Sequence, residues 1–160
     1  MRPETEDINR ILELLAQAPI LLETATRGLQ STRLNFRSEE EPWSVSDILA
    51  HLRACSDVWG TSIIAMITKD NPSIRYVSPR SWMKKPKYAD QKFVAALESF
   101  TEEREKLVKI LAELDDSNWE RPYTFTKTSA RQRNQTVFSY AERIVNHELH
   151  HLEQIESLLR

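Results

Sequence analysis

Three of the four histidines of this chain lie in the pentapeptide His147-Glu148-Leu149-His150-His151, inside a long helical pattern. Residues four apart on an α-helix lie roughly 40° apart around the axis and about one turn apart along it. The imidazoles of His147 and His151 can therefore aim at one point, which suits a divalent metal ion when both rings are neutral. His150 falls on the polar flank of the helix, so we expect it to be exposed.

The His147 and His151 pair shares its helix face with apolar side chains, namely Tyr140, Ile144, Ile155 and Leu158. Such a face packs inward, and polar groups are costly to bury without partners. Two explanations fit: two core histidines that each hydrogen-bond a neighbour or water, or two ligands of a metal ion. The fourth histidine, His51, lies far away in the sequence, so a three-histidine site requires its helix to lie alongside this one.

The composition of the 160 residues limits both the fold and the partners. A chain of this length forms one ordinary domain, 1 to 160, that can bury its own core. Only 2 glycines are present, which excludes Gly-rich phosphate loops and argues against a fold rich in tight β-turns. The net charge of −2 provides no positive field, so we expect neither nucleic acid nor an anionic membrane as a partner.

The single cysteine and the lack of long apolar segments bear on where in the cell the protein is located. Cys55 alone cannot form an internal disulfide, and the sequence has neither an apolar N-terminal segment nor an apolar run that could span a membrane. We expect a soluble protein of a reducing cytoplasm.

Four segments carry apolar residues at helical spacing, which predicts an all-α fold. They cover about 4 to 29, 45 to 68, 90 to 114 and 137 to 159. We expect the first segment to break or kink at Pro19. Ser44 and Asp47 have the spacing of a capping box at the start of the second segment, and Thr136 is suited to cap the fourth.

The second segment has an apolar face that includes a histidine, and the third has a run of charged residues. His51 lies on the apolar face of the second segment, together with Cys55, which we interpret as core filler rather than as a metal ligand. The charged run at 102 to 106 in the third segment is interpreted as a solvated face.

The connection at 70 to 88 is long, proline-bearing, basic and aromatic, and we expect it to lack regular structure. In extended form it can run the length of a bundle as a crossover. Its side chains suggest either a cover for an anionic substrate or a solvated loop anchored by Trp82. Elsewhere we expect a loop at 31 to 43, an extended segment or short strand at 123 to 126, and a surface turn at 127 to 133.

Four amphipathic helices predict a four-helix bundle. His51 lies about 10 Å from the start of the second helix, and the His147 and His151 pair lies about 16 Å before the end of the fourth. If these two helices are antiparallel neighbours, all three histidines lie at similar heights in the bundle.

Three short motifs, in this order and spacing, resemble those of the DinB superfamily, which includes the YfiT-like proteins. They are Pro-Trp-Ser-Val-Ser-Asp-Ile-Leu-Ala-His-Leu at 42 to 52, Asp-Ser-Asn-Trp-Glu-Arg at 116 to 121, and His-Glu-Leu-His-His-Leu-Glu-Gln-Ile at 147 to 155. The similarity covers nearly the whole chain. It implies a four-helix bundle with up-down-down-up connectivity, in which residues 70 to 88 form the long crossover between helices two and three.

The resemblance also implies a metal site and partners. The metal ligands of the family carry over to His51, His147 and His151, a set that leaves one position open to water or substrate, as in catalytic zinc sites. Zinc or nickel is the expected metal, with iron and manganese as further candidates. Members of the family include transferases and isomerases that use bacillithiol, mycothiol or glutathione, and proposed metal-dependent hydrolases. Homodimers are frequent among them.

Residues 147 to 151 also spell the His-Glu-x-x-His motif of zinc proteases, in which the glutamate is a general base. We reject a protease, because we expect no sheet that would hold an extended peptide. Glu148 is still a candidate catalytic residue, as a base near metal-bound water. The other interpretation of Glu148 is a partner for an arginine across a dimer interface.

Two functions from different classes follow. The first is an enzyme in which a metal held by His51, His147 and His151 presents water or a low-molecular-weight thiol to a small electrophilic molecule, for hydrolysis or thiol transfer. The second is a stress-related dimeric binding or scaffold protein whose histidines hold a structural metal or none.

Overall fold

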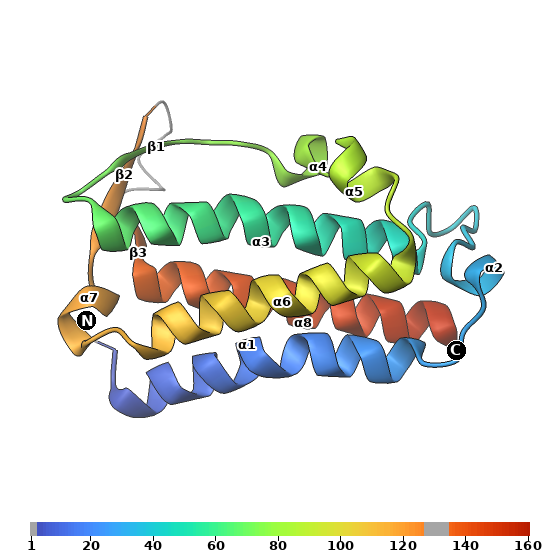
Figure 1. Ribbon diagram of the computed structural model, residues 1–160, viewed down its shortest axis with the longest axis horizontal. Helices are drawn as coiled ribbons and strands as arrows, with labels where there is room; N and C mark the ends of the chain where they lie inside the picture. Colours follow the sequence, from blue (N-terminus) through green and yellow to red (C-terminus); the bar gives the residue numbers. More distant parts are fainter. Residues whose placement is uncertain (1–2, 127–134) are drawn as a thin grey trace.

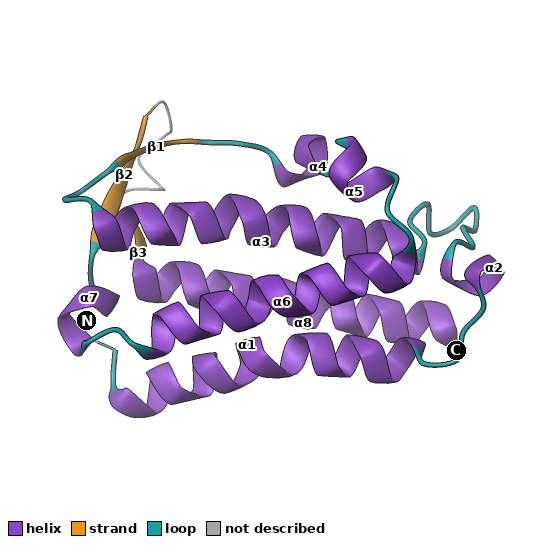
Figure 2. Cartoon of the chain, viewed as in Figure 1, coloured by secondary structure: helices purple, strands orange, loops and turns teal. Residues whose placement is uncertain are grey.

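The computed structural model describes residues 3–126 and 135–160, arranged as in Figures 1 and 2. Four long helices form a bundle: α1 (Thr5–Thr26), α3 (Val45–Thr68), α6 (Phe93–Ala112) and α8 (Val137–Leu159). The shorter elements are α2 (Ser31–Leu34), β1 (Ser73–Arg75), α4 (Pro79–Trp82), α5 (Pro86–Ala89), α7 (Asp116–Trp119), β2 (Pro122–Thr126) and β3 (Gln135–Thr136). The predicted four-helix bundle is confirmed. The surface turn predicted at 127 to 133 lies outside the described residues.

The four bundle helices form a ring in which each helix packs on two others. Helices α1 and α3 both pack on α6 and on α8. The colour gradient of Figure 1 shows that α1 and α8 run in one direction, and α3 and α6 in the other. Helices α3 and α8 are therefore antiparallel neighbours, which is the arrangement that a three-histidine site requires.

Capping boxes set the starting points of the two helices that carry the histidines. At α3, the Asp47 N–H donates to Ser44 Oγ over 3.1 Å, and the Ser44 N–H donates back to the Asp47 carboxylate over 2.8 Å. At α8, the Ser139 N–H donates to Thr136 Oγ1 over 3.2 Å, and the Thr136 N–H donates to Ser139 Oγ over 2.8 Å. Each box satisfies backbone donors that a helix start leaves without intrahelical partners.

The first helix was predicted to break or kink at Pro19. It does not break, since α1 continues through this residue. A proline inside a helix removes one backbone hydrogen bond, and the buried apolar face of α1 compensates for this loss. The helix ends at Thr26, and Gly28, with a φ of 77°, takes the left-handed conformation just after it.

The prediction that residues 70 to 88 lack regular structure is also wrong. Pro79 and Pro86 are the first residues of α4 and α5, a position where the fixed φ of proline favours a helix and its missing N–H has no cost. Strand β1 pairs in parallel with β2, and β2 pairs antiparallel with β3, which confirms the short strand expected at 123 to 126. The connection does return along α3, as Figures 1 and 2 show.

The connection between α3 and α6 is fastened to α3 by polar contacts. Lys87 Nζ lies 2.7 Å from the Asp57 carboxylate, and the Tyr88 hydroxyl donates to the same carboxylate. The Trp82 Nε1–H donates to the Tyr88 hydroxyl over 3.0 Å, so Trp82 serves as the predicted anchor. Arg53 Nη1 of α3 donates to the Lys87 carbonyl of α5 over 3.4 Å. These contacts hold α4 and α5 over the N-terminal half of α3.

A polar layer, made of His51, Arg104, Glu148, His147 and His151, separates two apolar clusters of the core. One cluster contains Cys55, Ile63, Met66, Leu107, Leu111, Ile144 and Val145. The other contains Ile48, Leu49, Leu52, Ala96, Phe100, Leu152 and Ile155. Of the polar layer, only His147 is half-buried and the rest is buried. Buried polar groups need partners, so the contacts within this layer decide how the bundle helices align.

Arg104 and Glu148 form an ion pair inside the bundle. Both nitrogens Nη1 and Nη2 of Arg104 donate to the Glu148 carboxylate, the former over 2.8 Å, and Nη2 also donates to Ser56 Oγ over 2.8 Å. The exposed fraction of Arg104 is 1%. The interpretation of the run 102 to 106 as a solvated face is therefore wrong at Arg104. The partner of Glu148 is an arginine of the same chain rather than one across an interface.

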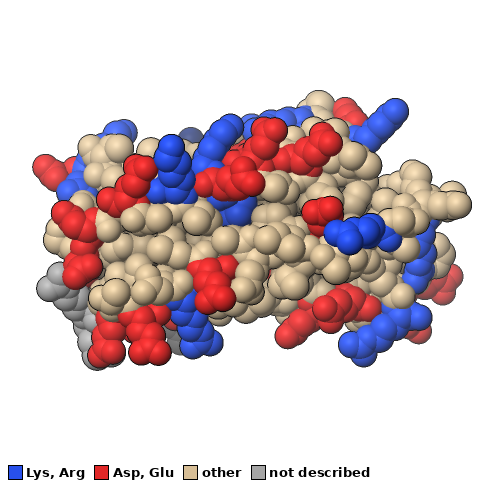
Figure 3. Space-filling model, turned by 60° about the horizontal axis from the view of Figure 1, so that its bottom comes forward, with Lys and Arg blue, Asp and Glu red and all other residues tan. Residues whose placement is uncertain are grey.

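The surface of the molecule carries charges of both signs. On the face of Figure 3, where α1 comes forward, acidic and basic side chains are interspersed around a broad band of uncharged residues. Ile20 and Leu21 of α1 and Val94 of α6 are exposed apolar side chains. Within residues 3–126 and 135–160, no helix has both the length and the apolar composition that a membrane span needs.

The buried ion pair should make a large contribution to folding. We expect Glu148→Gln to lower the free energy of unfolding by about 3 kcal/mol, because it leaves the buried Arg104 charge unpaired. The matched change at an exposed pair, Glu23→Gln, should cost less than about 0.5 kcal/mol, since Glu23 and Arg27 lie 3.6 Å apart in water. Urea denaturation measures both, and equal effects of the two changes would contradict this account.

Candidate metal centre

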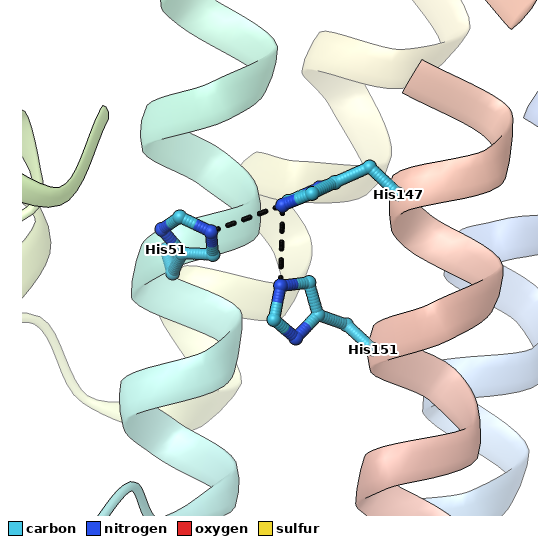
Figure 4. A group of neighbouring side chains, drawn as sticks. All are labelled: His51, His147 and His151. Atoms are coloured by element: carbon cyan, nitrogen blue, oxygen red, sulfur yellow. Dashed lines mark hydrogen bonds between the residues drawn. The ribbon is translucent and has the colours of Figure 1, made fainter. Parts of the chain in front are cut away.

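Three imidazole rings, from two neighbouring helices, point their Nε2 atoms at one another (Figure 4). His147 Nε2 lies 3.1 Å from His51 Nε2 and 3.2 Å from His151 Nε2. All three ligand atoms lie within 4.8 Å of one another. The structure thus brings together the three residues that were predicted from sequence as ligands.

The donor set fits a divalent metal ion. A tetrahedral ion with metal–nitrogen bonds of about 2.1 Å needs ligand nitrogens about 3.4 Å apart. Two of the nitrogen separations here, 3.1 and 3.2 Å, are close to that distance. Three protein nitrogens leave one position for an exchangeable ligand, whereas purely structural zinc sites use four protein ligands.

The Nδ1 atoms, which point away from the other two rings, also affect whether the histidines can bind a metal ion. His151 Nδ1 lies 2.8 Å from Gln154 Oε1. An amide oxygen only accepts, so Nδ1 carries the proton and Nε2 of His151 presents a bare lone pair toward the other rings. His147 Nδ1 is buried and has no hydrogen-bond partner among the described residues.

Two indole rings support the histidines from the sides. Trp43, just before α3, lies 4.9 Å from the ring of His51 and 6.2 Å from that of His151, measured between centroids. Trp59 contacts the ring of His147 edge-on at 4.9 Å. Aromatic packing of this kind restricts the rotation of the imidazoles, so the site is organised before any ligand arrives.

The three imidazoles of the site are uncharged at neutral pH. Burial, with the charge of His151 and of Arg80, lowers the pKa of His51 to about 4. Burial, with the charges of the neighbouring histidines and Arg143, lowers the pKa of His147 to about 3. Burial also lowers the pKa of His151. Neutral imidazoles are the form that binds metal ions, so the lone pairs are available at neutral pH.

The histidines form one wall of a cavity of about 760 Å³, a volume typical of small-molecule sites. The other lining residues come from α3, from the connection before α4, and from α4 and α8; they include Cys55, Trp59, Tyr76, Arg80, Glu142 and Arg143. The predicted crossover thus covers the site, and the ligands face the space in which a small molecule would lie.

Cys55 is closer to the site than its interpretation as core filler suggests. Its Sγ lies 3.5 Å from His51 Nε2, and the residue lines the cavity. Burial raises the pKa of the Cys55 thiol well above its ordinary value, so it remains a thiol at neutral pH. His150 is exposed, as predicted.

Glu148, the candidate catalytic residue, points away from this cavity. It does not line the cavity, its exposed fraction is 3%, and Arg104 binds its carboxylate. Sequence reasoning suggested the basic connection at 70 to 88 as a cover for an anionic substrate, but it did not single out Arg80, and it missed Arg143; both line the cavity. The spacing of Arg143 four residues before His147 places it on the same helix face and was the available signal.

The bundle and its three converging histidines define a class of helical proteins with a candidate metal centre between antiparallel helices. The chain belongs to the DinB superfamily, whose family model matches residues 14–155. Among solved structures it is similar to YfiT from Bacillus subtilis, described as a probable metal-dependent hydrolase with an unusual four-helix bundle topology. That similarity has a TM-score of 0.84 and 18% sequence identity, and it covers 98% of this chain and 87% of YfiT. At this identity the likeness shows the fold. No curated protein matches the chain.

The depressed histidine pKa values predict how stability depends on pH. An unfolded histidine has a pKa of about 6.5, whereas His51 and His147 have values of about 4 and about 3 in the fold. Between these values the unfolded chain binds more protons, so the metal-free protein should lose stability as the pH falls from about 7 toward about 4. Denaturation at a series of pH values measures this slope.

The slope should be shallower in His147→Gln, which removes one of the depressed groups. Ser157→Ala, an exposed change on the same helix, should keep the slope of the unchanged protein. A slope that is the same in all three proteins would show that the buried imidazoles are not responsible.

Proposed function

We propose that this protein is a divalent-metal-dependent enzyme that acts on a small molecule in the cavity beside His51, His147 and His151. One observation carries the proposal: three neutral imidazoles converge at the wall of a cavity of about 760 Å³ rather than inside the sealed core. A structural site would have no need of a cavity, whereas a catalytic site must admit a substrate.

The residues of the chain have separable tasks in this proposal. His51, His147 and His151 hold the ion, and a bound divalent ion would supply Lewis acidity and a lowered pKa for water or a thiol at its open position. Gln154 holds His151 in the tautomer that binds metal. Trp43 and Trp59 keep the imidazoles in place.

We assign Glu148 a positioning role through the ion pair with Arg104. It follows His147 directly in α8, and its carboxylate is bound by an arginine of α6. The pair therefore aligns α8 with α6 at the height of the metal ligands. A carboxylate held in this way is poorly placed to accept a proton from a substrate, since proton transfer requires hydrogen-bond reach.

Hydrolysis and thiol transfer both fit this geometry, since each uses one activated nucleophile and one electrophile. The homodimer, the thiol and the choice of zinc or nickel, with iron and manganese as further candidates, stay predictions. A stress-related scaffold protein, the second hypothesis, would not need the histidines to face a cavity.

The proposal is tested with protein loaded with zinc or with nickel. We expect turnover of activated esters, or transfer of cysteine or glutathione to an electrophile such as monobromobimane. His51→Ala should reduce that turnover about a thousandfold, because the several kcal/mol supplied by the ion would be lost.

Ser157→Ala is the control, since it truncates an exposed side chain of the same helix that does not line the cavity, and it should retain full turnover. Equal turnover in His51→Ala and in the unchanged protein would contradict the proposal. A fully metal-loaded protein that acts on no substrate of either class would favour the scaffold hypothesis.

A further inference from the structure

Two arginines line the cavity of the metal centre from different parts of the fold. Arg80 belongs to α4, in the connection that covers α3, and Arg143 belongs to α8, one turn before His147. Both are exposed side chains on the rim. They are brought to one cavity only by the packing of the connection over the bundle.

Each guanidinium lies on an indole ring that also packs against a histidine of the site. Arg80 Cζ lies 5.5 Å from the centroid of Trp43, which contacts His51 and His151. Arg143 Cζ lies 5.1 Å from the centroid of Trp59, which contacts His147. Stacking on an aromatic face holds a guanidinium in place while its N–H donors stay available. The two arginines are therefore fixed relative to the histidines.

Neither arginine has a carboxylate partner among the described residues. In contrast, Arg37, Arg53, Arg104 and Arg121 each form an ion pair with an Asp or Glu. Glu142 lines the same cavity but does not form an ion pair with its neighbour Arg143 in the described part of the chain. The cavity is thus lined by two guanidinium groups and one carboxylate, which leaves an excess of positive charge.

Both guanidinium groups lie near the metal centre, because each stacks on an indole ring whose centroid is 4.9 Å from that of a histidine ligand.

We propose that Arg80 and Arg143 form an oxyanion-binding site, and that the substrate is a small molecule carrying a carboxylate or phosphate group. The planar guanidinium matches both groups by paired N–H donors. The anionic group would lie between the two arginines, and the reacting part of the molecule would lie at the histidines. The assignment of a reacting part rests on the proposed function, whereas the oxyanion site does not.

The first experiment uses metal-free protein, so that it does not depend on the metal centre. Calorimetry compares succinate and inorganic phosphate with the neutral analogue succinamide at constant ionic strength. We expect both anions to bind and succinamide not to bind. Arg80→Gln and Arg143→Gln should each weaken anion binding about tenfold, the effect of one charge-assisted hydrogen bond.

The matched control is Arg75→Gln, which removes an exposed arginine from the same connection but from a different cavity. It should leave anion binding unchanged. Equal binding of succinate and succinamide, or anion affinities that are unaffected in both Arg80→Gln and Arg143→Gln, would overturn the proposal.

The second experiment uses zinc-loaded protein and two hydroxamates that share one metal-binding end. Succinohydroxamate carries a terminal carboxylate, and its amide counterpart carries a neutral carboxamide. The carboxylate should bind about tenfold more tightly, and the double variant of Arg80 and Arg143 should lose this preference. Equal affinities in the unchanged protein would overturn the link between the oxyanion site and the metal centre.

The two experiments separate the two proposals. Zinc uptake without any preference for the carboxylate or for anions would refute the oxyanion site and leave the metal-dependent function intact. Anion binding that depends on Arg80 and Arg143 in a protein that takes up no metal would refute the metal-dependent function and retain the oxyanion site.

Discussion

Three imidazole nitrogens pointing at one another inside a helical bundle impose the main physical constraint on this structure. Polar groups at this depth are costly unless they have partners, and the polar layer that contains them interrupts the apolar core between two clusters. Arg104 and Glu148 satisfy each other within the layer, whereas the inner nitrogens of His51, His147 and His151 have mainly one another. A divalent ion is the partner that accepts three lone pairs at once.

Other parts of the fold position the three histidines and the residues around them. Capping boxes at Ser44 and Thr136 set where α3 and α8 begin, and the Arg104–Glu148 pair sets how α6 and α8 align. The long connection between α3 and α6 is fastened through Asp57, and it brings Arg80 to the cavity from outside the bundle. An arginine from the connection and another from α8 thereby face the same space as the metal ligands.

Sequence reasoning predicted the features that depend on local pattern. Helical periodicity predicted the four bundle helices. The spacing of His147 and His151 and the register of His51 allowed a shared site, and the resemblance to the DinB superfamily implied that these three residues are metal ligands; the structure brings them together. It failed where distant contacts decide. The strand in the crossover depends on pairing with β2, far along the chain. The short helices α4 and α5 were missed for another reason: Pro79 and Pro86 are local helix-start signals that were interpreted as loop signals. The burial of Arg104 within a charged run depends on Glu148, 44 residues later. Arg80 reaches the site through tertiary packing that no local pattern records.

The central claim is that the three histidines bind one divalent ion, and the most direct test is the metal content of protein purified without an affinity tag. Elemental analysis should find about one equivalent of metal in the unchanged protein and in His150→Ala, and almost none in His51→Ala and His147→Ala. If the unchanged protein takes up no zinc, nickel or iron even after reconstitution, the histidines are buried polar groups of a helical bundle and the metal centre proposed here does not exist.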